Sequence, residues 1–269
     1  MPGLKFIGIA GASGSGKGEV SKKIEEKLGA RCLTISMDWF YKHFPEKSEK
    51  ERAAANYDIP DSLDWNLLLE KISELKAGKE LVELPGYEFA THLRKDVTTK
   101  VNPADYDTVI IDGILLFTNA DVLKELDLKV YVHADQELCL VRRVFRDVEE
   151  RGRDALDVLN QYLKYVRPAF YQYILPTRTL PGVIEVSNNL RLEDIIMTNV
   201  FEAIDNLLNV AVNVIVAAAA STVTYASPRS PVANLTTSYG KFRNGTPSPT
   251  PVPACGDTPE ISVRKNSHS

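Results

Sequence analysis

Short apolar runs alternate with amphipathic helical patterns from the beginning of the chain to about Asn209. The runs predict strands, because four to eight consecutive apolar residues between turn residues are typical of buried strands. The predicted strands are Lys5–Ala10, Cys32–Ser36, Thr108–Asp112, Lys129–His133 and Gly182–Val186. Since they read as continuous apolar runs separated by helices, they indicate a parallel sheet of about five strands, covered on both faces.

Helical periodicity fills the intervals between these strands. After the first strand, apolar residues recur every four positions from Val20 to Leu28, and Gly29 is expected to end this helix. Further helices are predicted over Asp64–Lys76 and Gln136–Arg151. The order of strands and helices predicts an α/β domain with three layers.

The chain changes character near residue 221. The segment 221–269 contains seven of the fifteen prolines, many serines and threonines, and almost no clusters of large aliphatic residues. Such a segment buries too little apolar surface to offset its chain entropy. We therefore expect a folded domain over residues 1–220 and a disordered Ser/Thr/Pro-rich tail over residues 221–269.

Six hydroxyl residues of the tail directly precede a proline. One interpretation is that any tail of this composition contains such pairs, and the other is that they are sites of proline-directed phosphorylation. The six residues are Ser227, Ser230, Thr246, Ser248, Thr250 and Thr258.

Composition limits the classes of function and partner. The 32 basic and 36 acidic residues leave a net charge of -4, so neither nucleic acid nor an anionic membrane is an expected partner. The three cysteines lie far apart, which favours neither a zinc site nor a disulfide framework. No signal peptide is visible, and the apolar run 207–220 is too short to span a membrane. We expect a core or terminal helix in that run, and a cytoplasmic protein.

A glycine-rich loop follows the first predicted strand. Residues Gly11–Lys17 fit the pattern GxxxxGK and lie between a strand and a helix, which is the context that a P-loop requires. Glycines let the backbone amides turn towards phosphate oxygens, and the helix N-terminus and Lys17 add positive charge. Gly18 stands where a Ser or Thr hydroxyl would normally bind magnesium. The predicted nucleotide contacts are Gly11, Ala12, Ser13, Gly14, Ser15, Gly16, Lys17, Gly18 and Glu19.

Two aspartates are predicted at the carboxyl edge of the sheet, where ligands bind in open α/β folds. Asp112 ends a predicted strand, which is the position of a Walker-B acid that reaches Mg²⁺, although such an aspartate can instead cap the next helix. Asp38 ends the second strand region beside three aromatic residues. A carboxylate there can deprotonate an attacking hydroxyl and help to hold the metal, or it can be a solvated loop residue.

Arginines crowd the segment from Arg142 to Arg153, and Arg143 and Arg146 share a helix face. Two glutamates lie among them, so one interpretation is a solvated helix with internal salt bridges. The other is a lid that closes on phosphates, where fixed cations stabilise charge on the transferred group and water is excluded. We favour the lid.

Several motifs follow the phosphate loop in a fixed order. They are DWFYK from Asp38, NYDIPDSLDW from Asn56, YEFATHLR from Tyr87, IIDGILLF from Ile110, RRVFRDVEERGRD from Arg142 and QYLKYVRPAF from Gln161. In this order they resemble the uridine kinase (uridine-cytidine kinase) family, within the wider group that contains phosphoribulokinase. The resemblance extends from about Lys5 to Thr177. It implies a P-loop kinase sandwich with a small β-hairpin substrate insert and an arginine-rich helical lid.

The resemblance also implies an activity, namely transfer of the γ-phosphate of ATP or GTP, with Mg²⁺, to the 5'-hydroxyl of uridine or cytidine. Asp38 would be the base at that hydroxyl, with Lys17 on the phosphates, and Asp58 would accept hydrogen bonds from the ribose. The pyrimidine would be contacted by Tyr87, Phe89 and His92. The nucleoside side would also involve Arg143, Arg153 and Gln161, the triphosphate Arg146 and Arg151, and the metal Asp112 and Asp38. The resemblance further suggests a homotetramer.

Three features depart from the family pattern and leave alternatives open. Gly18 lacks the hydroxyl, Asp112 replaces a glutamate, and the segment from Glu185 to Asp194 replaces a G-A-D-N turn. One alternative is therefore a catalytically weak nucleotide-binding regulator whose tail recruits partners. Another is a related kinase for a different small hydroxyl compound, such as phosphoribulose or a vitamin riboside, which fits the P-loop but fits YEFATHLR poorly. No guanine-reading NKxD motif is found, so a GTPase is not expected.

Overall fold

The computed structural model describes residues 4–95, 98–189 and 197–207. Within them, a parallel sheet is formed by β1 (Lys5–Gly11), β2 (Cys32–Ser36), β7 (Thr108–Asp112), β8 (Leu128–His133) and β9 (Val183–Ser187). The strands lie in the order β2-β7-β1-β8-β9, so β1 pairs with β7 on one side and with β8 on the other. The predicted five-strand parallel sheet is confirmed, with the last strand one residue later than predicted.

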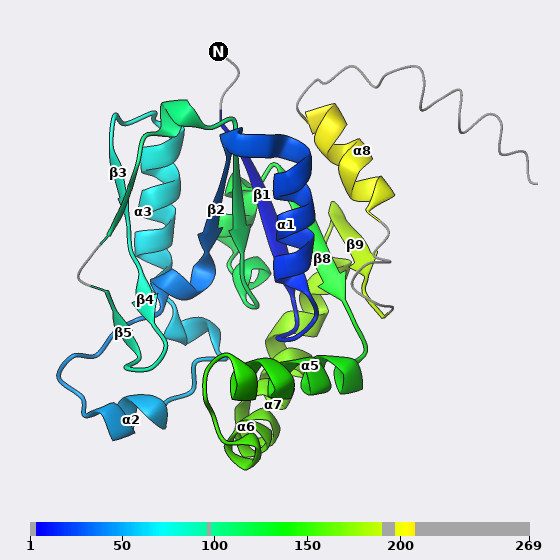
Figure 1. Ribbon diagram of the computed structural model, residues 1–269. Coiled ribbons are helices and arrows are strands. Elements are labelled where there is room, and N and C mark those ends of the chain that lie inside the picture. The colour runs from blue at the N-terminus through cyan, green and yellow to red at the C-terminus, as the bar shows by residue number, and fades with distance from the viewer. Residues whose placement is uncertain (1–3, 96–97, 190–196, 208–269) are drawn as a thin grey trace, which may run out of the picture. The chain divides into compact units, whose positions relative to one another are not determined.

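Helices cover both faces of the sheet and extend past its carboxyl end (Figure 1). They are α1 (Lys17–Leu28), α2 (Glu49–Ala53), α3 (Trp65–Lys76), α4 (Ala120–Glu125), α5 (Gln136–Glu149), α6 (Ala155–Gln161), α7 (Arg167–Ala169) and α8 (Thr198–Leu207). Two π-helical segments, Tyr162–Val166 and Phe170–Ile174, flank α7.

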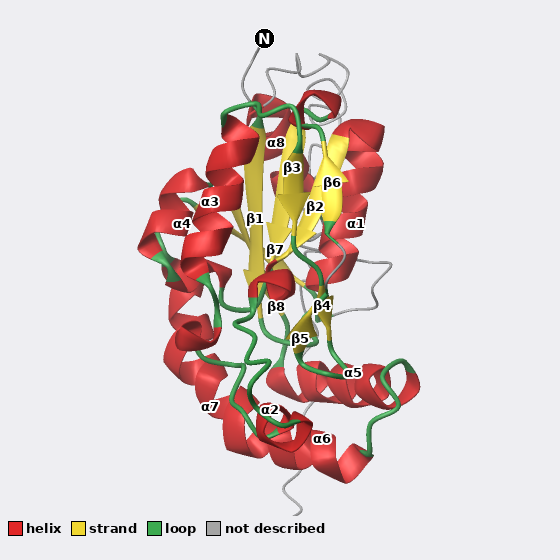
Figure 2. Ribbon diagram, turned by 90° about the vertical axis from the view of Figure 1, so that its left-hand side faces the viewer, coloured by secondary structure: helices red, strands yellow, loops and turns green. Residues whose placement is uncertain are grey.

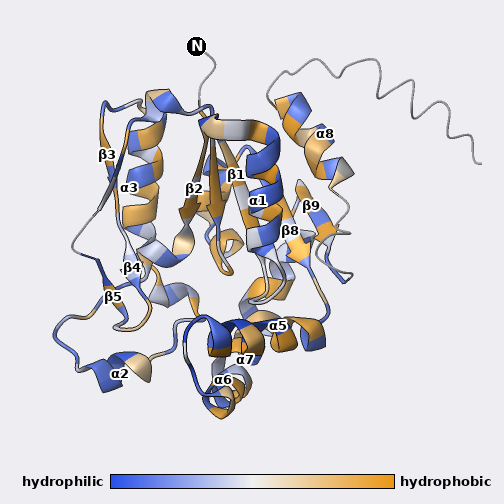
Figure 3. Ribbon diagram, viewed as in Figure 1, coloured by the Kyte–Doolittle hydropathy of each residue, from blue (hydrophilic) through white to orange (hydrophobic). Residues whose placement is uncertain are grey.

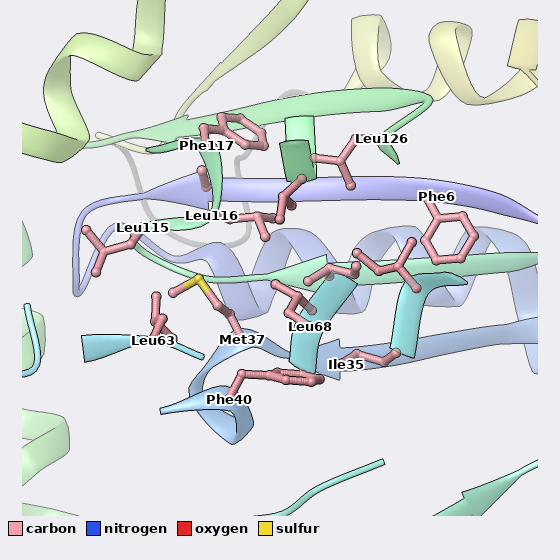
Figure 4. Packing of buried hydrophobic residues seen from close by; sticks show 14 of the residues in the cluster. Phe6, Ile35, Met37, Phe40, Leu63, Leu68, Leu115, Leu116, Phe117 and Leu126 are labelled. Atoms are coloured by element: carbon pink, nitrogen blue, oxygen red, sulfur yellow. The ribbon is translucent and has the colours of Figure 1, made fainter. Parts of the chain in front are cut away.

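Side chains that alternate along the strands divide the core into two layers. Phe6 and Ala10 of β1 belong to the layer that contains residues of α3 and α4. Ile7 and Ile9 belong to the opposite layer, with residues of α1 and α8. Figure 2 shows the sheet between α3 and α4 on one side and α1 on the other, and Figure 4 shows the packing of the first layer around Phe6. Hydrophobic residues are concentrated in the central strands (Figure 3).

Helix ends follow local signals in the sequence. Gly29 ends α1 with a φ of +74°, a left-handed conformation that glycine adopts without strain. The Asp64 side chain accepts a hydrogen bond from the amide of Leu67 at 3.1 Å and so caps α3, whose first residue is one later than predicted. Helix α5 ends at Glu149, two residues earlier than predicted, and the chain then turns through Gly152 at a φ of +63°.

Two short antiparallel pairs extend the chain between α3 and β7. Strand β3 (Val82–Leu84) pairs with β6 (Thr99–Val101), and β4 (Tyr87–Glu88) pairs with β5 (Leu93–Arg94). The β4–β5 hairpin lies at the same end of the sheet as α2, α5 and α6 (Figure 1). It is the small hairpin insert that the family resemblance implied.

The predicted tail, residues 221–269, and almost all of the apolar run 207–220 lie outside the described residues, so both expectations stay predictions. In the described part of the chain, no helix combines the length and the apolar character needed to cross a membrane.

Candidate active site

The P-loop connects β1 to α1 and is shaped by glycines. Gly14 and Gly16 have φ angles of +83° and +91°, and a Cβ atom on Gly14 would lie 2.2 Å from the carbonyl oxygen of Cys139 in α5. Only glycine fits this close approach of two backbones. Gly16 caps α1 without any side-chain hydrogen bond, so no capping side chain occupies the amides of the first turn. These amides can bind a phosphate.

Lys17 lies between two carboxylates at the carboxyl end of the sheet. Its ammonium donates a hydrogen bond to the carbonyl of Ala12 at 3.0 Å. Asp112 is the last residue of β7, and Asp38 lies in a single helical turn just after β2 rather than in the strand itself. Since Ser36 and Asp112 are register partners on neighbouring strands, both carboxylates reach the same edge.

Burial sets the proton affinities of these three groups. It raises the pKa of Asp38, against the opposing charges of Lys17, Arg151 and Arg146. It raises the pKa of Asp112 to about 6, with Lys17 again opposing the shift and Asp38 adding to it. It lowers the pKa of Lys17, although both aspartates favour the charged ammonium. Perturbed groups that face one another in a cavity are typical of functional sites.

Aromatic rings form a second part of the site. The ring of His92 stacks on that of Tyr57, with centroids 4.9 Å apart and planes 8° from parallel. Tyr41 contacts Tyr57 edge-on at 5.4 Å and lies 5.5 Å from Tyr87, which in turn contacts Phe89 at 5.4 Å. Flat surfaces of this kind suit a planar ligand.

The carboxyl group of Asp58 is buried beside these rings, and the side chain is only 6% exposed. Desolvation raises its pKa, and the nearby charges of Arg143 and Arg153 oppose that shift. A buried carboxylate that retains acceptor capacity suits a ligand that carries hydroxyl groups.

Four of the arginines form ion pairs with one buried aspartate, Asp147; they are Arg143, Arg146, Arg151 and Arg153. The Asp147 side chain is fully buried. From this cluster Arg143 also donates a hydrogen bond to the hydroxyl of Ser13 in the P-loop at 2.8 Å. On the opposite wall, the guanidinium of Arg151 lies 4.6 Å from the centre of the Phe89 ring, a cation–π contact. The arginine segment therefore faces both the phosphate loop and the hairpin.

One cavity of about 1450 Å³ is lined by the P-loop, the three aspartates Asp38, Asp58 and Asp112, the aromatic rings and the arginines. Its walls include all but three of the predicted site residues, and it adds Tyr41 and Tyr57. The lining residues from the prediction are Ser13, Gly14, Gly16, Lys17, Gly18, Glu19, Asp38, Asp58, Tyr87, Phe89, His92, Asp112, Arg143, Arg146, Arg151, Arg153 and Gln161. The other three, Gly11, Ala12 and Ser15, are buried within the loop and outside the lining.

Comparison with known proteins agrees with this arrangement. Residues 6–184 match the phosphoribulokinase / uridine kinase family. The chain belongs to this family. The uridine kinase of Staphylococcus aureus (strain JH9) is 39% identical over 203 residues, which cover 74% of this chain and 97% of that protein.

Solved structures of low sequence identity show the same fold for this kinase. A protein from Silicibacter sp. TM1040, provisionally described as a fructose transport system kinase, is 20% identical over 68% of this chain and 90% of its own, with a TM-score of 0.57. The D-glycerate 3-kinase of Cryptococcus neoformans var. grubii is 16% identical over 73% of this chain and 89% of its own, with a TM-score of 0.55. The P-loop kinase fold expected from the sequence is thus confirmed.

One residue of the kinase site that sequence reasoning missed is Asn188, which follows β9. Its side-chain nitrogen donates a hydrogen bond to the carbonyl of Ser15 in the P-loop at 2.7 Å, and its main-chain carbonyl accepts one from Arg142 at 3.1 Å. Asn188 is fully buried. Asn188 therefore supports the phosphate loop. A polar residue directly after a predicted parallel strand, at the ligand-binding edge of the sheet, was the available signal.

The raised pKa of Asp112 makes the stability of the ligand-free kinase depend on pH. The folded protein holds a proton on Asp112 up to about pH 6, whereas the ordinary pKa is 3.8, so stability falls as pH rises through this range. We expect Asp112→Asn to have a larger free energy of unfolding than wild type at pH 7.5 without nucleotide or metal, by up to roughly 3 kcal/mol, and so to unfold at a higher temperature. The difference should disappear near pH 4. Thermal unfolding at both pH values tests this, and a variant less stable than wild type at pH 7.5 contradicts it.

Proposed function

We propose that this kinase phosphorylates uridine or cytidine at the 5'-hydroxyl with the γ-phosphate of ATP, and so produces UMP or CMP. The observation that carries the proposal is the single cavity shared by the P-loop, Asp38, the aromatic rings and the arginines. The name of the Staphylococcus aureus relative supports the choice of substrate. GTP is an alternative donor, because the loop recognises phosphates and not the base.

In the proposed reaction, Asp38 accepts the proton of the 5'-hydroxyl while the hydroxyl oxygen bonds to the γ-phosphorus. The bond between that phosphorus and the bridging oxygen then breaks, and ADP leaves. Burial raises the pKa of Asp38 and makes it a better base than an exposed aspartate, while Lys17 and Arg151 oppose the shift and favour its ionised form. Lys17, Arg146 and Arg151 stabilise the negative charge on the transferred group.

On the acceptor side, Asp58 accepts hydrogen bonds from the ribose hydroxyls. The base lies against Tyr87, Phe89 and His92, and burial lowers the pKa of His92, which favours a neutral imidazole with one donor and one acceptor. Tyr57 holds the His92 ring by stacking. The remaining proposed contacts of the nucleoside are Arg143, Arg153 and Gln161.

Mg²⁺ fits this site. The described residues contain no group of three or more histidine, cysteine or acidic side chains that could hold a metal by themselves. Mg²⁺ usually binds one or two carboxylates, several waters and the phosphates of a substrate, and Asp112 and Asp38 are two such carboxylates. Burial raises the pKa of both carboxyl groups. A cation beside them would lower these pKa values and favour the ionised forms. When bound, the ion neutralises charge that develops on the phosphates.

A panel of acceptors tests the proposed function. Purified protein with ATP and Mg²⁺ is expected to convert uridine or cytidine to the monophosphate, and 5'-deoxyuridine, which lacks the accepting hydroxyl, is the matched negative control. Ribulose 5-phosphate and nicotinamide riboside should remain unphosphorylated. Phosphorylation of either one in preference to uridine would support the alternative of a related kinase with another substrate.

The regulator hypothesis rests on Gly18, Asp112 and the Pro-rich tail, and restoring the hydroxyl at Gly18 tests it. A Cβ atom at Gly18 would have no neighbour within 4 Å, so serine fits without rearrangement. We expect Gly18→Ser to raise kcat with Mg-ATP by roughly threefold to tenfold, because the hydroxyl adds a metal ligand. ATP affinity without Mg²⁺ should stay nearly unchanged. Gly18→Ala is the control for added bulk.

If wild type has measurable turnover and Gly18→Ser and Gly18→Ala have equal turnover, the absence of a hydroxyl at position 18 does not limit catalysis. Undetectable phosphoryl transfer in all three proteins, with ATP binding intact, would favour the nucleotide-binding regulator over the nucleoside kinase.

A further inference from the structure

The buried carboxylate of Asp147 divides the arginine cluster between its two oxygens. Oδ1 accepts hydrogen bonds from the Nε and a terminal nitrogen of Arg146, at 2.9 and 2.7 Å, and lies 3.3 Å from Arg151. Oδ2 faces Arg143 and Arg153, each at 3.6 Å. Each oxygen therefore holds one pair of arginines.

The two pairs differ in what else they contact. Arg143 and Arg153 both donate hydrogen bonds to the side-chain oxygen of Gln161, at 2.9 and 2.7 Å. Arg143 is also near Asp58 on the acceptor side. Arg146 and Arg151, by contrast, are the arginines whose charges act on Asp38, together with Lys17. Arg143 also donates a hydrogen bond to Ser13 of the P-loop, and Arg151 also lies against the Phe89 ring of the hairpin. Through these contacts the arginines around Asp147 connect the phosphate side of the cavity with its acceptor side.

Four guanidinium groups around one carboxylate repel one another. With the charge of Asp147 they carry a net charge of +3, and without it +4. The carboxylate is fully buried, so its attraction for them is weakly screened by water. Oδ1 accepts hydrogen bonds, whereas Oδ2 makes only the two ion-pair contacts at 3.6 Å. A buried carboxylate between four arginines has few alternative positions, and it limits the directions in which its partners point.

We propose that Asp147 is a positioning residue of the transfer reaction: it holds four arginines in fixed directions between the phosphate loop and the acceptor side of the cavity, and it acts as their counter-ion. Its own side chain touches neither substrate. The proposal deepens the proposed function, since the roles of the two pairs rest on it. The competing interpretation is that Asp147 only stabilises the fold of this segment.

Asp147→Asn separates these interpretations, because asparagine keeps the shape and removes the charge. We expect kcat to fall about tenfold to thirtyfold, since the guanidinium groups lose their fixed directions. KM for ATP should not rise, because the arginine cluster of the variant has a larger net positive charge and attracts the anionic ATP at least as strongly. For the same reason, pyrophosphate should bind to Asp147→Asn about threefold to tenfold more tightly than it binds to wild type, as measured by calorimetry. Glu137→Gln, an exposed acid on the same helix, is the control and should change neither quantity.

A stability measurement keeps the test valid if the variant folds poorly. At equal ionic strength, Asp147→Asn should unfold at a lower temperature than wild type in chloride, and sulfate should recover at least half of that loss. A divalent anion can replace the missing counter-ion, whereas wild type and Glu137→Gln should respond much less to sulfate. Equal losses in both salts, or pyrophosphate binding that is unchanged or weaker, would overturn the proposal. These readouts need no turnover, so they remain decisive even if uridine proves not to be the substrate.

Discussion

Replacing Asp38 with asparagine is expected to lower kcat for uridine phosphorylation by ~10² to 10⁴, the range for loss of a general base. Asparagine can still accept a hydrogen bond from the 5'-hydroxyl, but it cannot take the proton. KM for both substrates should change little, because Lys17 and the arginines that bind the phosphates remain. Steady-state kinetics with saturating Mg-ATP measure the effect.

The pH profile provides a second measurement of the same assignment. Burial raises the pKa of Asp38, so wild-type kcat/KM should fall as pH drops through that raised value and the base becomes protonated. This acidic limb should be absent from the residual activity of Asp38→Asn. Asp105→Asn, a change of the same chemistry at an exposed position before β7, is the control. Wild-type turnover in Asp38→Asn would remove Asp38 from the mechanism.

Features that depend on neighbouring residues could be predicted from the sequence. The P-loop has its strand, glycines, lysine and helix within one continuous segment, so the motif and its context are read together. The sheet followed from apolar runs, because a strand buried on both faces has no polar side. The Gly29 stop was likewise a local signal.

Features that depend on residues far apart in the sequence could not be predicted in this way. Asp147 is shortly followed by two glutamates, and only the fold shows that its side chain turns inward while Glu149 and Glu150 stay exposed. Asn188 reaches Ser15 across 173 positions, and no local pattern encodes that pairing. Tyr57 was part of a quoted motif, yet its role as the ring beneath His92 requires the β4–β5 hairpin to fold against it. The Asp38 position illustrates the same limit, since β2 ends two residues before it.

Replacing Lys17 with methionine is expected to lower kcat by ~10² to 10³, the range for loss of one preorganised group that stabilises the charge of the transition state. Methionine keeps most of the length of the side chain and removes the charge. Lys17 is also the positive charge that most favours the ionised forms of Asp38 and Asp112, so its loss should raise the pKa of each further. Affinity for ATP without Mg²⁺ should fall as well, because the P-loop then offers amides alone.

This second consequence distinguishes Lys17 from a residue that only contacts phosphate. If the ammonium holds the two carboxylates in their ionised forms, the acidic limb of the pH profile should move to higher pH in Lys17→Met, and activity should recover partly as pH rises. Lys22→Met, on the exposed face of α1, is the matched control and should retain wild-type kinetics. A uniform loss of activity at every pH would mean that Lys17 acts on the phosphates alone, and near-normal turnover would exclude it from the transfer step.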